Sequence, residues 1–158
     1  MLAVTFTSIV LAIHVMAVVA AFGMVLAYPV FVPWLRRAHP EVMPGFHDAQ
    51  DVIGKRLMSP GMVVVLAAGV YLASKEDVWS EVWVSVPLLI LLVLGGLGGA
   101  YFSPKGRRLG ELAQRDLQSG GSLGGEYDAL FAQVRMVGLV AAALVLVAIF
   151  FMVAKPGA

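Results

Sequence analysis

Among the side chains that could do chemistry, His14 is the one that stands well inside an apolar stretch. It lies about ten residues into the first expected helix, which at about 1.5 Å per residue places it about 15 Å deep, near the middle of a bilayer. A neutral imidazole there can ligate haem iron or another metal through one nitrogen while the other N–H donates to an oxygen. It can instead form a hydrogen bond between two helices. His14 is therefore a candidate metal ligand, with the interhelical bond as the alternative.

Three cations stand at the edges of apolar stretches: Lys55, Arg56 and Arg135. Cations at the mouth of a helix bundle suit an anionic ligand, such as the propionates of haem, and they also suit anionic lipid. Arg135 can alternatively extend its side chain to the membrane surface. We treat these three residues, together with His14, as candidate cofactor-binding residues.

Other potential ligands have simpler explanations as well. His47 and Asp51 are four residues apart, so the carboxylate could orient the imidazole, but we expect His47, and also His39, to be solvated loop histidines. Met58 and Met62 could present two thioethers to Cu(I), or they could fill the protein core. None of these residues belongs to a recognisable catalytic motif.

Composition excludes several classes of function. The chain of 158 residues contains no cysteine, which excludes disulfides, thiolate metal sites and a catalytic thiol. Its net charge of +1 provides no field for nucleic acid. Patterns typical of NTP hydrolysis, of zinc peptidases and of α/β-hydrolases do not occur in the sequence.

The elements that must position these residues are transmembrane helices. Hydrophobic residues make up 60% of the chain and charged residues only 13%, and the charges are segregated from long apolar runs. Runs of about 20 apolar residues span the hydrocarbon core as helices, because lipid leaves backbone polar groups no other partner. We expect an all-α fold, a single domain over residues 1–158 that is an integral membrane four-helix bundle. The expected helices cover 4–35, 55–74, 82–103 and 130–154, with cytoplasmic loops at 36–54 and 104–129.

Helical periodicity within the two loops predicts short amphipathic helices near residues 46–57 and 107–117. Nine of the eleven Lys and Arg residues lie in or beside these loops, and only Lys75 and Lys155 lie on the other side. The positive-inside bias then places both termini outside and predicts a multi-pass protein of the cell membrane, as in a bacterial inner membrane.

Gly95 and Gly99 form a G-x-x-x-G pair in the third expected helix. Such spacing lets two helix backbones approach closely in lipid. The partner helix could belong to the same bundle, to a second copy in a homodimer, or to a larger membrane complex.

Two segments resemble the HemJ-type membrane protoporphyrinogen oxidases. Residues 12–19 (AIHVMAVV) followed by Phe22-Gly23 resemble the first helix of that family, and residues 55–65 (KRLMSPGMVVV) resemble the start of its second helix. The resemblance implies a four-span fold in which His14 is a haem b ligand. The chain is also similar to the CopD-like copper-resistance group and to uncharacterised bacterial four-span proteins.

The functional hypothesis from the sequence is a haem b-binding membrane protein with a redox role, either electron transfer or a porphyrinogen-oxidase-like reaction. Two alternatives stay open. One is a non-enzymatic assembly subunit of a larger membrane complex, and the other is a copper-handling membrane protein. Whether the chain is an enzyme depends on a bound cofactor, because the apolar runs contain so few acid–base groups.

Overall fold

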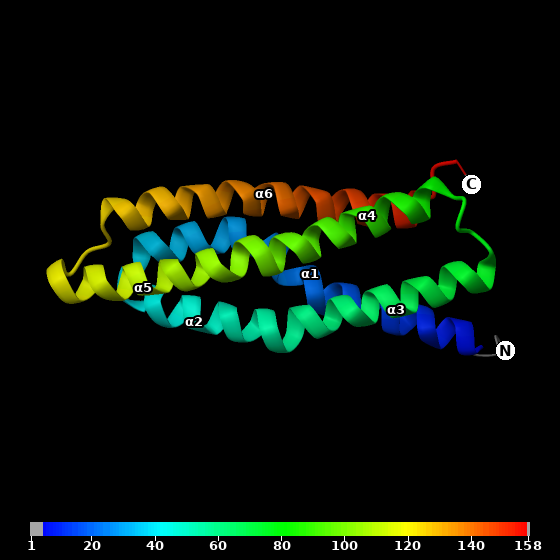
Figure 1. Cartoon of the computed structure of the whole chain (residues 1–158), viewed down its shortest axis with the longest axis horizontal. Helices are drawn as coiled ribbons and strands as arrows, with labels where there is room; N and C mark the ends of the chain where they lie inside the picture. The colour runs from blue at the N-terminus through cyan, green and yellow to red at the C-terminus, as the bar shows by residue number, and fades with distance from the viewer. Residues whose placement is uncertain (1–4, 158) are drawn as a thin grey trace.

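The computed structural model describes residues 5–157, and all the regular structure in that range is helical. The elements are α1 (Phe6–Ala38), η1 (Pro40–Val42), α2 (Met43–Ile53), η2 (Gly54–Met58), α3 (Ser59–Glu76), α4 (Val82–Gly96), η3 (Leu97–Phe102), α5 (Ser103–Gly120) and α6 (Gly125–Ala154). Figure 1 shows them running lengthwise beside one another as a bundle.

Four continuous rods form the bundle, and each is long and apolar enough to cross a membrane. The rods are Phe6–Ala38, Pro40–Glu76, Val82–Gly120 and Gly125–Ala154. Large apolar side chains point outward along them, as Val30 (79% exposed) and Val153 (78%) show. Outward apolar surface of this kind is stable in lipid, so the prediction of an all-α, four-helix membrane protein is confirmed.

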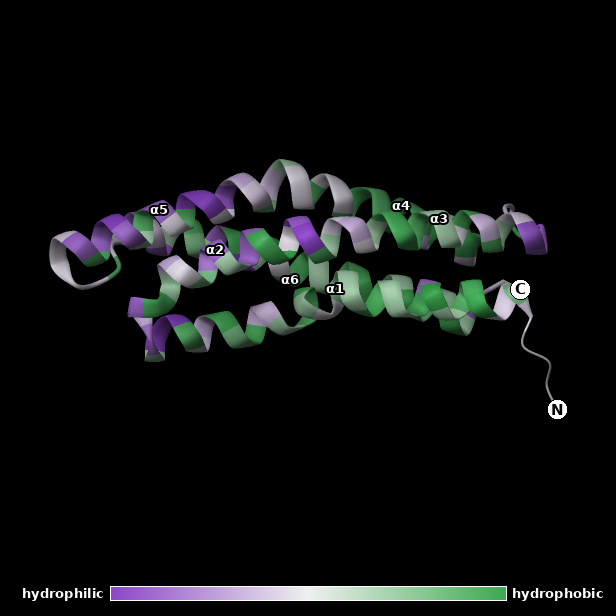
Figure 2. Cartoon of the chain, turned by 90° about the horizontal axis from the view of Figure 1, so that it is seen from below, coloured by the Kyte–Doolittle hydropathy of each residue, from purple (hydrophilic) through white to green (hydrophobic). Residues whose placement is uncertain are grey.

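The two middle rods are longer than a bilayer requires. The rod of 39 residues, which contains α4, η3 and α5, is about 58 Å long at 1.5 Å per residue, against about 30 Å of hydrocarbon. Figure 2 shows hydrophilic residues concentrated along α5 and α2 and hydrophobic residues toward the opposite end of the bundle. The bundle therefore continues beyond the hydrocarbon as a polar helical end.

The structure differs from the sequence prediction in the two expected loops. Segments 36–54 and 104–129 are largely helical, since α2 and α5 join directly onto the membrane helices through η2 and η3. The predicted amphipathic helices exist, but as extensions of the spans. The fourth helix likewise begins at Gly125 instead of 130.

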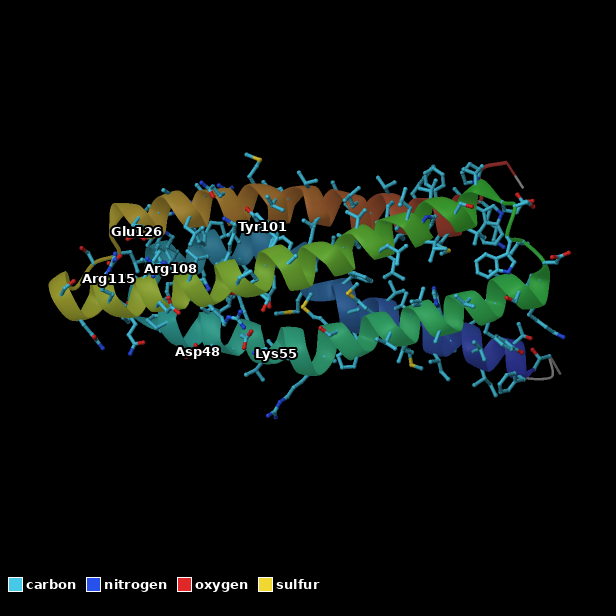
Figure 3. All side chains as sticks on the ribbon, viewed as in Figure 1. Asp48, Lys55, Tyr101, Arg108, Arg115 and Glu126 are labelled. Carbon is cyan, nitrogen blue, oxygen red and sulfur yellow. The ribbon has the colours of Figure 1, made fainter. Side chains whose placement is uncertain are left out.

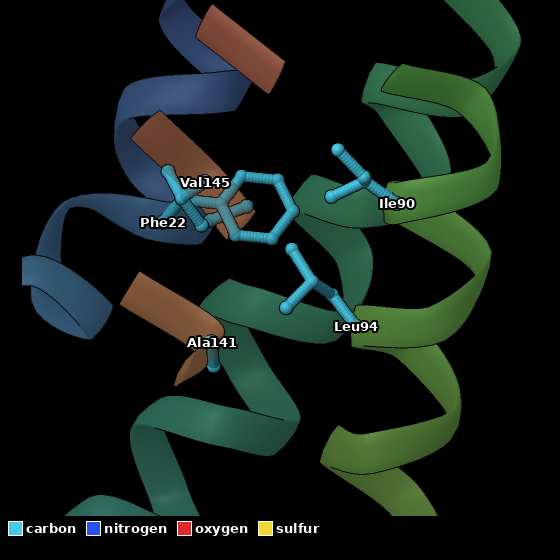
Figure 4. Packing of buried hydrophobic residues seen from close by; sticks show 6 residues of the cluster. Phe22, Ile90, Leu94, Ala141 and Val145 are labelled. Carbon is cyan, nitrogen blue, oxygen red and sulfur yellow. The ribbon is translucent and has the colours of Figure 1, made fainter. Parts of the chain in front are cut away.

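Two apolar clusters hold the helices together. The membrane cluster joins α1, α4 and α6 and contains Ala21, Phe22, Ile90, Leu94, Ala141 and Val145, most of which are labelled in Figure 4. The polar-end cluster contains Val32, Met43, Leu109, Leu112, Ala113 and Tyr127. The second cluster explains why polar segments fold as helices, because α2 and α5 bury their apolar stripes against α1 and α6.

Contacts between α5 and α6 close the polar end. Gly121 has a φ of +70°, a conformation that suits glycine, and it ends α5. The Asp116 carboxylate then accepts the Gly124 N–H at 2.8 Å. Glu126 pairs with Arg108 at 2.8 Å and with Arg115 at 3.0 Å, and Figure 3 labels these three residues at the turn. These contacts fix where α6 begins.

Candidate functional site

A cavity of about 330 Å³ lies inside the bundle, between the two apolar clusters. Its lining includes Phe22 and Ala141 from the membrane cluster and Val32 and Leu109 from the polar-end cluster. All four rods contribute to the wall. A volume near 300 Å³ is at the lower end of the range for small-molecule sites, and a site between bundle helices is a common place for one.

Glycines create much of this space. Six of them line the cavity: Gly54, Gly95, Gly98, Gly99, Gly106 and Gly138. At five of the six, a Cβ atom would meet no atom within 4 Å; at Gly95 it would lie 3.1 Å from the Met62 methyl group. The predicted G-x-x-x-G pair therefore faces the cavity within its own chain. The structure contains no second copy, so a homodimer through Gly95 and Gly99 stays a prediction.

The two π-helical segments, η2 and η3, both border the cavity. Gly54, Lys55 and Met58 come from η2, and Gly98 and Phe102 come from η3. A π turn widens the helix and changes the direction of the residues that follow it, and such turns occur frequently at functional sites. Here they lie where the apolar membrane helices meet the polar end.

His47 forms the polar part of the wall together with two hydrogen-bond partners. The prediction of a solvated histidine is wrong here, because His47 is 4% exposed. Its Nε2 lies 2.9 Å from the hydroxyl of Tyr127, which is fully buried, and its Nδ1 lies 2.8 Å from Oε1 of Gln50. The expected partner Asp51 instead forms an ion pair with Lys55. Both ring nitrogens of His47 are thus engaged, which leaves neither available to a metal.

Three cations line the cavity: Lys55, Arg107 and Arg135. Lys55 is paired with Asp51, whereas neither arginine forms an ion pair within residues 5–157. Arg56, the neighbour of Lys55, is exposed and is not among the lining residues. The structure therefore brings together two of the three predicted cations and adds Arg107.

His14 lies elsewhere in the bundle. It precedes Phe22, the first cavity residue of α1, by eight positions, about 12 Å along the helix. Its ring faces α3, where a Cβ on Gly69 would lie 3.3 Å from His14 Cε1. His14 Nδ1 is buried and has no hydrogen-bond partner in the described chain, although the Val65 carbonyl is near the ring. The structure therefore separates His14 from the cavity that Lys55 and Arg135 line.

The remaining predicted ligands are distributed differently. Met58 and Met62 both line the cavity, and His39 lies on the surface with Nδ1 3.2 Å from Glu41. Within residues 5–157 no group of three or more His, Cys, Asp or Glu side chains could hold a metal ion. Met58 and Met62 both bring a thioether, a ligand type that Cu(I) prefers, to the cavity wall, so a copper site there stays a prediction.

Sequence reasoning did not select Tyr28, Gln50 or Arg107 as site residues, although all three line the cavity. Gln50 belongs to the apolar stripe of the predicted helix 46–57, and Arg107 stands in a basic run, so both were visible as residues but not as neighbours. Scans of the chain against protein-family models, against curated proteins and against solved structures find no match. The cavity and its arginines therefore carry the functional conclusion.

Proposed function

We propose that this integral membrane protein binds an amphipathic molecule from the bilayer, with its apolar part in the cavity and its anionic head group at Arg107 and Arg135. The observation that carries the proposal is the combination of an apolar, glycine-lined cavity with two arginines that have no ion-pair partner in the described chain. The binding function requires no catalytic group.

Charge supports this proposal. Arg135 lies about 15 Å along α6 from the start of the helix, directly before the apolar run that begins at Met136. Arg135 is exposed at this edge of the apolar run, and a carboxylate or phosphate would supply the opposite charge and the hydrogen-bond acceptors that no side chain of residues 5–157 gives it.

Size supports it as well. At about 30 Å³ for each water-sized group, the cavity holds roughly eleven such groups. A methylene is similar in size to water, so one acyl chain segment fits.

The test uses stearate and stearyl alcohol, which share a chain but differ in charge, as probes for delipidated protein in an uncharged detergent. We expect stearate to bind and stearyl alcohol to bind at least tenfold more weakly. Arg135→Gln should weaken stearate binding about tenfold, the value for a charge-assisted hydrogen bond reduced for the exposure of the arginine. Arg56→Gln is the matched control and should bind stearate normally. Equal binding of the two probes, or equal losses in the two variants, would contradict the proposal.

Haem binding through His14 alone is a second candidate, and the buried His14 Nδ1 without a hydrogen-bond partner favours it. When bound, haem would supply redox chemistry for electron transfer or porphyrinogen oxidation. Binding would require α3 to move away from α1 at Gly69. A Soret band in protein from haem-supplied cells, lost in His14→Ala, would support this candidate. Absence of such a band would contradict haem binding. His14 would then serve only as a contact between α1 and α3 near the Val65 carbonyl, the role expected in a non-enzymatic assembly subunit.

We also propose that the two termini face outward. The start of α1 and the end of α6 lie at the same end of the bundle, opposite the polar end that carries most of the cations (Figure 1). Because the chain contains no cysteine, single cysteines report their location cleanly. Gly157→Cys should react with a membrane-impermeant maleimide in intact cells, and Gln118→Cys only after permeabilisation. The reverse pattern would contradict the orientation.

A further inference from the structure

Tyr28 brings an unused hydrogen-bond donor to the cavity. It lines the cavity from α1, and its hydroxyl oxygen is buried without a partner in the described part of the chain. The ring packs edge-on against Phe46, with the centroids 6.2 Å apart, so its position is fixed by packing. A buried hydroxyl without a partner is uncommon in proteins and calls for an explanation.

Gln50 adds donors beside it. Because Gln50 presents Oε1 to His47 Nδ1, the proton of the imidazole lies on Nδ1, and Nε2 accepts the hydroxyl hydrogen of Tyr127. In this orientation the two N–H hydrogens of the Gln50 amide form no hydrogen bond within residues 5–157. The amide lies near the Tyr28 hydroxyl but outside hydrogen-bond geometry.

We propose that Tyr28 and Gln50 recognise a second oxygen of the ligand, a carbonyl or hydroxyl group on its chain. This inference rests on the proposed function, because it names a further feature of the molecule whose anionic end binds the arginines. The two side chains offer three donor hydrogens, and no acceptor in the described chain uses them. An oxygen that accepts from both would satisfy the buried Tyr28 hydroxyl and use the free N–H hydrogens of the half-buried Gln50. The ligand class is therefore an oxygenated amphipathic acid.

The experiment compares stearate with a series of oxostearates in which the ketone moves along the chain, so that the carboxylate stays constant. For the wild-type protein we expect oxostearates with the ketone at one position to bind about tenfold tighter than stearate, as expected for a buried hydrogen bond. Tyr28→Phe should bind the favoured oxostearate no more tightly than it binds stearate, and a cooperative thermal unfolding transition shows that the variant folds. Tyr101→Phe removes a hydroxyl away from the cavity and should keep the preference.

The inference is overturned if no oxostearate binds the wild type more tightly than stearate, the result expected if only water uses these donors. It is also overturned if the preference survives in Tyr28→Phe. The proposed function fails separately, when stearate does not bind or binds equally to Arg135→Gln. If stearate binding depends on Arg135 but no ketone position is preferred, the proposed function stands and only the recognition of a second ligand oxygen is refuted.

Discussion

Replacing Gly138 by leucine should stabilise the bundle and weaken ligand binding at the same time. Gly138 lines the cavity from α6, and a Cβ there would meet no atom within 4 Å, so the new side chain is accommodated. Four added carbons occupy roughly 120 Å³ at about 30 Å³ each, about a third of the 330 Å³ cavity.

The two effects have different magnitudes. Removing a helical glycine stabilises by about 0.5–1 kcal/mol, which corresponds to a rise of about 1–4 °C in Tm for a chain of this size. A ligand segment the size of a leucine side chain makes at least about 40 contacts of about 0.1 kcal/mol, or about 4 kcal/mol in total. The ligand segment that leucine displaces would contact lipid or detergent instead. If those contacts recover half of the lost energy, binding still weakens by about 2 kcal/mol, on the order of 30-fold.

The assay is thermal unfolding in detergent combined with equilibrium binding of radiolabelled stearate. Gly96→Leu is the matched control, since Gly96 also has open space at its Cβ position but does not line the cavity. It should raise Tm similarly and leave stearate binding unchanged. A lower Tm for Gly138→Leu would refute the account of open space at Gly138. Unchanged binding would refute the placement of the ligand.

Three further variants test the helix contacts. Tyr127→Phe leaves Nε2 of His47 without its donor in a buried site, and we expect a loss of about 1–3 kcal/mol in unfolding free energy; a loss near zero would show that the bond is absent. Gly61→Leu inserts a side chain where a Cβ already lies 3.1 Å from a buried alanine of α1, so Tm should fall by the equivalent of about 1–3 kcal/mol, and an unchanged Tm would contradict the close approach. Asp128→Asn removes the half-exposed ion pair with Arg36 and should change stability by less than about 1 kcal/mol in urea titrations, with a larger loss indicating a stronger pair.

The four membrane helices could be predicted because lipid imposes one rule on the whole chain. A charge-free run of sufficient length must be helical, whatever it packs against. No comparable rule predicts the conformation of the polar segments. Their composition is typical of loops. They are helical because Met43, Leu109 and Leu112 are buried in a cluster formed by several segments, which cannot be recognised from any one segment of the sequence.

The site could be predicted only in part, for a geometric reason. Lys55 and Arg56 are neighbours in the sequence, and only the first lines the cavity. The direction in which each side chain points depends on its rotation about the helix axis. The π turn of η2 changes this rotation, and the sequence does not predict that turn. The depth of His14 could be estimated from the sequence, but its direction toward Gly69 depends on the rotation of α1 against α3.

Photo-crosslinking tests the central claim most directly, because it reports where the ligand lies. A diazirine-bearing stearate is activated in the presence of the protein, and the labelled residues are mapped by peptide mass spectrometry. The account predicts label on cavity residues such as Met58, Met62 and Phe102, reduced by excess stearate and not by stearyl alcohol. Label confined to outward-facing side chains such as Leu92 and Val153, without competition by stearate, would contradict it.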